Sequence, residues 1–168
     1  MDKKEELLAG LKEAMIAERT GIEFYTTAAE KTADPKGKEV FQRLAEEERK
    51  HLEYLHQQFG YLTGNNAEPQ LDIQSGLDQN QASPIFSPEL RQRIKTAHWE
   101  MTALAVGVAL EQASINHYQQ LARQAETEEV RRFFDSLVRW EQSHATALQK
   151  QYNYLRESYW YEAGFAPF

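Results

Sequence analysis

The sequence predicts an all-α protein, a four-helix bundle built from two similar helical hairpins. Apolar residues recur at alternating steps of three and four, and the pattern of the first half returns 93 positions later without insertion or deletion. Steps of three and four place side chains on one face of a helix, as expected for a helix packed in a bundle. With 168 residues, 41% of them hydrophobic and 27% charged, the composition suits a single globular domain spanning residues 1–168.

The first hairpin is expected to comprise helices at about 3–32 and about 35–59. Asp34-Pro35 supplies an N-cap residue followed by proline at the first helical position, and Gly60 marks the end of the second helix. The core-facing positions of the two helices, called the seam below, are Leu8, Leu11, Met15, Glu18, Ile22, Tyr25 and Ala29, then Phe41, Leu44, Glu48, His51 and Leu55.

A long connection of about 60–87 separates the two hairpins. It is rich in Asn, Gln, Gly and Pro and lacks helical periodicity, and a helical pattern restarts at Ser87-Pro88-Glu89. One long crossover between two helical hairpins is the connectivity of ferritin-like bundles, because the connection must travel the length of the bundle. Helices at about 97–125 and about 128–156 follow.

The aromatic C-terminal extension, 157–168, is expected to pack on the bundle or across a homodimer, since exposed apolar patches are uncommon on monomers.

Charged residues take part in the repeat. The identical seam pairs are Glu18/Glu111, Ile22/Ile115, Tyr25/Tyr118, Ala29/Ala122, Phe41/Phe134, Leu44/Leu137, Glu48/Glu141, His51/His144 and Leu55/Leu148. A duplicated structural unit explains the apolar pairs, because each hairpin must bury its face against a partner. It does not explain why glutamate and histidine repeat at core positions.

The repeated polar residues predict a site for two metal ions. The candidate ligands are Glu18, Glu48, His51, Glu111, Glu141 and His144. An ionised carboxylate removed from water without a partner costs several kcal/mol, and no seam lysine or arginine is present to pair with these. Two divalent ions would balance four glutamates, and neutral imidazoles would complete the coordination. The alternative is a polar core satisfied by hydrogen bonds.

Several nearby residues are expected to lie outside this site. Glu53 and His56 also have the Glu-x-x-His spacing but fall off the seam, which indicates a solvated helix face. The acidic pair Glu46-Glu47 is likewise expected on a solvated face, and Trp140 is expected to pack at a helix or subunit contact.

Tyr25 and Tyr118 lie seven residues after Glu18 and Glu111, about two helical turns, and so share their faces. Each is a candidate to donate a hydrogen bond to a metal ligand from a facing helix. The alternative is a core tyrosine whose hydroxyl is satisfied elsewhere.

Composition excludes several classes of function. A net charge of −7 and a pI near 5.3 argue against nucleic acid as a partner. The absence of cysteine excludes disulfides, zinc knuckles and thiolate-held iron–sulfur sites within these residues. The N-terminal stretch lacks the apolar run of a signal peptide, and no run approaches the ~20 apolar residues of a membrane span. We therefore expect a cytoplasmic protein without membrane contact.

The motifs resemble the rubrerythrin branch of the ferritin-like di-iron carboxylate proteins. The resemblance rests on AMIAERTGIEFY, FQRLAEEERKHLEYL, GVALEQASINHY and FFDSLVRWEQSHATAL, in this order. It implies that one iron ion is bound by Glu18 and His51 and the other by Glu111 and His144. It also implies that Glu48 and Glu141 bridge the two ions.

Two features depart from the family pattern. Peroxidase rubrerythrins usually carry a further glutamate three residues after the one on the third helix, where this sequence has Ser114. A rubredoxin domain, which needs four cysteines, is also absent. Electrons would therefore come from an external donor, such as a rubredoxin-like protein, or from ferrous iron.

The ligand set and this resemblance together predict a non-haem di-iron oxidoreductase that reduces hydrogen peroxide or dioxygen, with ferroxidase activity as one form of it, in an oxidative-stress or iron-detoxification role. Manganese or zinc could substitute for the two iron ions, because oxygen and imidazole ligands accept all three metals. The alternatives are a ferritin-like iron-binding or storage protein without turnover, and a metal-free helical interaction module. A homodimer is expected.

Overall fold

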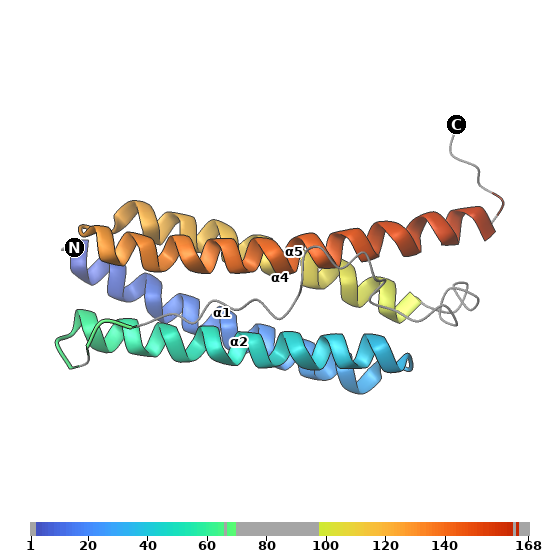
Figure 1. Cartoon of the computed structure of the whole chain (residues 1–168), viewed down its shortest axis with the longest axis horizontal. Coiled ribbons are helices and arrows are strands. Elements are labelled where there is room, and N and C mark those ends of the chain that lie inside the picture. The colour runs from blue at the N-terminus through green and yellow to red at the C-terminus, as the bar shows by residue number, and fades with distance from the viewer. Residues whose placement is uncertain (1–2, 66, 70–97, 163, 165–168) are drawn as a thin grey trace.

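The computed structural model describes residues 3–65, 67–69, 98–162 and 164, and all regular structure in them is helical. The helices are α1 (Lys3–Lys31), α2 (Pro35–Leu62), α4 (His98–Gln124) and α5 (Glu128–Glu162). Together they form a ferritin-like four-helix bundle (Figure 1), which confirms the predicted fold class. Residues 70–97 lie outside the described residues, and they include most of the predicted crossover at about 60–87 and the predicted helical restart at Ser87-Pro88-Glu89.

The bundle consists of two hairpins. α1 packs chiefly against α2 and α4 against α5, and the hairpins meet through α1 and α4. Contacts between Tyr25 and Glu111 and between Tyr118 and Glu18 show that α1 and α4 run antiparallel. This pairing brings the equivalent helices of the two repeats face to face.

The start of α2 is set by its cap, and its end by a glycine. Asp34 lies in extended conformation, its Oδ1 accepts a hydrogen bond from the Gly37 backbone N–H at 2.9 Å, and Pro35 follows, as predicted. The helix continues to Leu62, past the expected end at about 59. Gly60 therefore lies inside the helix and does not end it. The chain leaves the helix at Gly64, whose φ of 80° is in the region that favours glycine.

α5 is six residues longer than predicted, because the expected tail at 157–162 is helical. Leu155 is buried and Tyr159 packs against the core, so the amphipathic pattern continues, and no glycine or proline interrupts it before Gly164. The end of α5 projects past α1 and α2 (Figure 1). Trp160 and Tyr161 are 46% and 83% exposed there in the single chain, so they do not pack on the bundle, and packing across a homodimer stays a prediction. Residues 163 and 165–168 lie outside the described residues.

Small residues occupy much of the centre of α1. Ala14, Gly21 and Ala28 are buried, whereas the predicted seam residues Met15 and Ile22 are half-buried. Neighbouring helices limit the space at such positions: a Cβ added at Gly10 of α1 would clash with Leu121 of α4, and one at Gly21 would lie 3.5 Å from Glu48 of α2. A Cβ added at Gly107 of α4 would lie 3.2 Å from the Tyr25 hydroxyl oxygen and 3.1 Å from Leu148.

Two apolar clusters fill the bundle on either side of a polar layer. One cluster includes Phe41, Leu44 and Leu104, and the other includes Leu11 and Phe134. Along each helix the candidate ligands fall between residues of the two clusters. The polar layer is therefore sealed by apolar packing from both ends.

No helix in the described part of the chain is both long and apolar enough to span a bilayer.

Replacing Asp34 with alanine is expected to lower the free energy of unfolding by about 1–2 kcal/mol, because the Gly37 N–H loses its acceptor. Asp34→Asn keeps an acceptor oxygen and should cost less. Urea denaturation of both variants provides the measurement, and equal losses would contradict the assigned capping role.

Candidate metal centre

The six predicted ligands lie together in the middle of the bundle. α1 supplies Glu18, α4 supplies Glu111, and α2 and α5 each supply a Glu-x-x-His pair. All six side chains are buried, with at most 3% of each residue exposed. Because positions i and i+3 share a helix face, the glutamate and histidine of each pair point into the same layer.

One group of candidate ligands surrounds His51. Its Nδ1 lies 3.0 Å from Glu48 Oε2, 3.0 Å from Glu141 Oε1 and 3.6 Å from Glu18 Oε2. One ligand atom from each of these four residues lies within 4.8 Å of the others. Donor atoms from three helices thus surround a single point.

A second group surrounds His144 in the same way. Its Nδ1 lies 3.2 Å from Glu141 Oε2, 3.5 Å from Glu48 Oε1 and 3.7 Å from Glu111 Oε2. These four residues also meet the 4.8 Å condition. Glu48 and Glu141 belong to both groups, each offering one oxygen to either side. The arrangement fits two ions held side by side by shared carboxylates.

The pKa values of Glu18 and Glu111 shift toward the protonated form. Burial raises the pKa of Glu18 well above its ordinary value of 4.5, and the charge of Glu48 raises it further. Burial and the charges of Glu48 and Glu141 raise the pKa of Glu111 in the same direction. Both shifts arise because a buried carboxylate beside like charges resists ionisation.

The shared carboxylates and the histidines shift toward their charged forms. Burial opposes ionisation of Glu48 and Glu141, but the adjacent histidines lower both pKa values below 4.5. Burial also opposes protonation of His51 and His144, but the surrounding carboxylates raise both pKa values well above 6.5. In the protein without metal, four protons therefore compensate the charge of four glutamates.

The residues present fit a pair of divalent ions. Several buried atoms of the cluster have no hydrogen-bond partner among the described residues, namely Glu48 Oε1, both oxygens of Glu141, and His144 Nδ1. Such unpartnered buried atoms are uncommon, and a bound ion would satisfy them. Two divalent ions carry the same charge as the four protons they would displace, and carboxylate and imidazole are ligands for iron, manganese and zinc.

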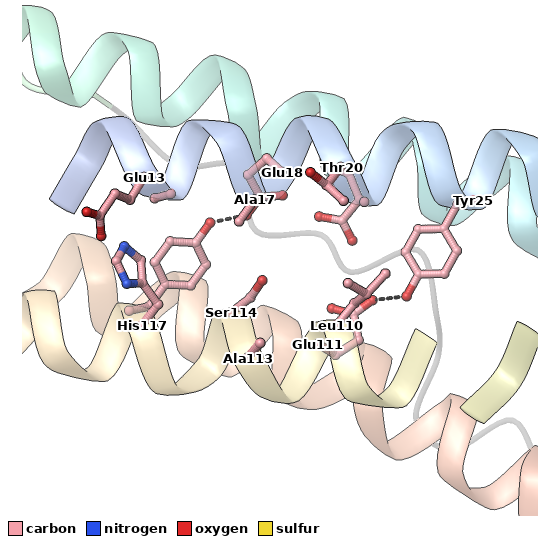
Figure 2. A pocket seen from close by; sticks show the side chains of 14 residues that line it. Glu13, Ala17, Glu18, Thr20, Tyr25, Leu110, Glu111, Ala113, Ser114 and His117 are labelled. Atoms are coloured by element: carbon pink, nitrogen blue, oxygen red, sulfur yellow. Dashed lines mark hydrogen bonds between the residues drawn. The ribbon is translucent and has the colours of Figure 1, made fainter. Parts of the chain in front are cut away.

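Each tyrosine singled out in the sequence donates a hydrogen bond to a candidate ligand across the α1–α4 contact. The Tyr25 hydroxyl donates to Glu111 Oε1 and the Tyr118 hydroxyl donates to Glu18 Oε1 (Figure 2). Burial and the carboxylates raise the pKa of both phenols, so the hydroxyls keep their protons. The predicted hydrogen bonds to a facing helix are therefore present, and they fix the orientation of these two carboxylates.

A pocket between α1 and α4 opens onto the cluster. It has a volume of about 380 Å³, and Glu18, Glu48 and Glu111 contribute to its lining (Figure 2). Small side chains of Ala17, Gly21 and Ser114 also line it. The site therefore has an approach from solvent, and Ser114 lines that approach.

Glu47 was assigned wrongly from the sequence, whereas Trp140 packs at a helix contact as predicted, but beside the site. Glu47 is 3% exposed rather than solvated, and its Oε2 lies 2.6 Å from His144 Nε2 and accepts a hydrogen bond from Trp140 Nε1 at 3.1 Å. Trp140 packs at a helix contact, and its neighbour there is the candidate ligand His51. The centroids of the two rings are 4.4 Å apart. The available signal was spacing, since Glu47 lies three residues after Leu44 and four before His51.

The other Glu-x-x-His pair in α2 behaves as predicted. Glu53 and His56 are exposed and take no part in either ligand group. Helical register, and not the motif, distinguishes the two pairs.

The fold and the buried cluster together define a ferritin-like bundle protein with a carboxylate and histidine site suited to metal. The rubrerythrin family profile matches residues 9–152, most of the chain. The chain belongs to the rubrerythrin family, a family of di-iron carboxylate proteins, which confirms the resemblance seen in the sequence. No curated protein and no solved structure matches it.

The metal-free protein is expected to lose stability as pH rises. Above the ordinary histidine value of 6.5, the folded cluster holds four protons on Glu18, Glu111, His51 and His144, whereas the unfolded chain holds none of them. The free energy of unfolding falls with pH wherever the folded state binds more protons. The fall should begin above 4.5, where unfolded glutamates ionise, and steepen above 6.5.

Urea denaturation with a chelator present, at about pH 6.5 and about pH 8.5, measures this dependence. The double variant Glu18→Gln and Glu111→Gln, which needs no proton to stay neutral, should show a shallower fall. Stability independent of pH in the unmodified protein would contradict the assigned protonation states.

Proposed function

We propose that this protein is a non-haem di-iron oxidoreductase that reduces hydrogen peroxide or dioxygen. The observation that carries the proposal is the pair of four-residue groups that share Glu48 and Glu141. Sharing of carboxylates keeps two ions close enough to act on one small molecule, as in other two-metal sites. Bound iron would supply the one-electron redox changes that the side chains of this site cannot provide.

Each candidate ligand would have a definite place in holding the two metal ions. Glu18 and His51 would hold one ion and Glu111 and His144 the other. Glu48 and Glu141 would contact both. The hydroxyls of Tyr25 and Tyr118 keep Glu111 and Glu18 in place, and each crosses from one hairpin to the other.

The packing around the site leaves an opening for a small molecule and excludes water on its apolar sides. The pocket between α1 and α4 admits a small molecule to the carboxylates, while Phe41 and Phe134, both fully buried, close the layer on either side. Reduction of hydrogen peroxide to two water molecules consumes two electrons and two protons. Since the sequence contains no cysteine for a rubredoxin-type centre, we propose an external electron donor such as a rubredoxin-like protein.

Ferrous iron is itself a candidate substrate, which would make the protein a ferroxidase. Glu13, Glu18, Glu48 and Glu111 line the pocket, which favours this reading, because carboxylate oxygens are ligands for a divalent cation. Ser114 also lines the pocket where peroxidase rubrerythrins carry a further carboxylate, so the peroxide route lacks one family feature. Iron storage without turnover is the alternative. The homodimer and the cytoplasmic location stay predictions.

Anaerobic titration of the metal-free protein with ferrous iron should show two ions bound per chain. Rapid mixing with hydrogen peroxide or with dioxygen, in separate runs, should then produce ferric absorption. The faster oxidant distinguishes a peroxidase from an oxidase or ferroxidase. Binding without oxidation would favour storage or a different metal, and no binding would refute the di-iron proposal.

The double variant Glu48→Gln and Glu141→Gln should lose the stabilisation by metal. A ligand at about 100 times its dissociation constant raises the free energy of unfolding by about 2.7 kcal/mol, and the variant lacks both shared ligands. Thermal denaturation with chelator and with Mn²⁺ gives the comparison, and Glu53→Gln, an exposed glutamate of the same helix, is the control. A metal-free interaction module predicts no gain from metal in any of the three proteins.

A further inference from the structure

The two halves of the site differ at the equivalent positions that directly precede the shared glutamates. Glu47 and Trp140 stand 93 positions apart, the spacing of the repeat, and each directly precedes a shared glutamate. All six candidate ligands and both tyrosines are identical between the halves, so this difference lies beside an otherwise symmetric cluster. Both residues are buried, at 3% and 1% exposed.

His144 is held at both ring nitrogens. Its Nδ1 faces the carboxylates of the cluster, and its Nε2 lies 2.6 Å from Glu47 Oε2. The same Glu47 oxygen accepts the hydrogen bond from Trp140 Nε1, so it acts as an acceptor, and His144 Nε2 donates to it. A carboxylate on the outer nitrogen fixes the tautomer and orientation of a ligating histidine and raises its basicity.

His51 has no such partner. Its Nδ1 faces the cluster as in His144, but its buried Nε2 has no hydrogen-bond partner in the part of the chain that the structure describes. The ring instead packs against the Trp140 indole, with centroids 4.4 Å apart and planes at 79°. An aromatic ring in this position fills space but offers no charge and only a weak acceptor.

Trp140 links the two environments. Its ring packs on His51, while its Nε1 donates at 3.1 Å to the Glu47 oxygen that also contacts His144. The indole thus holds the carboxylate of one half in place and occupies the corresponding space in the other half. The contact between Glu47 and Trp140 therefore gives the two histidines different surroundings.

We propose that Glu47 makes the two metal positions unequal, so that the position formed by Glu48, Glu111, Glu141 and His144 binds a divalent ion more tightly than the position around His51. This inference rests on the proposed metal centre. Glu47 acts as a positioning residue, through His144, and places a carboxylate beside that histidine only. The first ion bound is therefore expected on the His144 side, and the second on the more weakly held His51 side.

The first test locates one ion. Anomalous X-ray diffraction from crystals of the full chain loaded anaerobically with one equivalent of Fe²⁺ should show higher occupancy beside His144 than beside His51. Equal occupancies, or a preference for His51, would overturn the inequality while leaving a two-metal centre in place. Failure to bind any Fe²⁺ would overturn the centre and this inference together.

The second test uses binding isotherms of Fe²⁺ under anaerobic conditions. Glu47→Gln keeps the shape of the side chain and removes its charge, so the first binding step should weaken by about 10–100-fold and approach the second. Glu46→Gln is the matched control, since it makes the same chemical change at the exposed neighbour. Equal isotherms for the two variants would contradict the role of Glu47.

A third variant separates this role from a loss of folding. Trp140→Phe keeps an aromatic ring against His51 but removes the N–H donated to Glu47, so the first step should weaken by less than in Glu47→Gln and the second should not change. Circular dichroism without metal verifies the fold of each variant. Weakening confined to the second step would overturn the assignment.

Discussion

Four glutamates are buried in one layer of the bundle without a lysine or arginine paired to them among the described residues. The rest of the structure depends on how the charge of these carboxylates is compensated. Ionised together and unpaired, they would cost more than a domain of this size can tolerate. Protons on two carboxyls and two histidines remove the problem in the metal-free state, and two divalent ions would remove it equally well. The apolar clusters above and below make this compensation necessary, because they exclude water.

The fold and the cluster were accessible from sequence because both depend on helical register. A glutamate or histidine at a seam position must face the core, whatever its chemistry, so the repeat of Glu48 and His51 at Glu141 and His144 carries three-dimensional information. The same reasoning set aside Glu53 and His56, which are exposed. Asp34 likewise marks its helix start through local chemistry alone.

The errors occurred where the answer depends on the neighbouring helix. Glu47 is acidic and adjacent to Glu46, which suggests a solvated face, but Trp140 from α5 supplies a donor for it. Sequence cannot show that partner, since it lies on another element. Met15 and Ile22 were chosen over Ala14 and Gly21 for a similar reason. Hydrophobicity favours large residues, whereas the neighbouring helices decide which positions are buried, and Glu48 of α2 lies against Gly21. The end of α5 depends on core contacts of Leu155 and Tyr159.

A chain with two unlike hairpins can build a site that two identical hairpins related by a twofold axis cannot. Two identical hairpins associating around a twofold axis could also bring four glutamates and two histidines together, but every position would then face its own copy. Glutamate opposite glutamate would place two more buried negative charges beside the cluster, and tryptophan opposite tryptophan would leave neither histidine with a carboxylate partner. Glu47 opposite Trp140 requires two hairpins of different sequence, and covalent linkage in one chain guarantees that the unlike halves always meet.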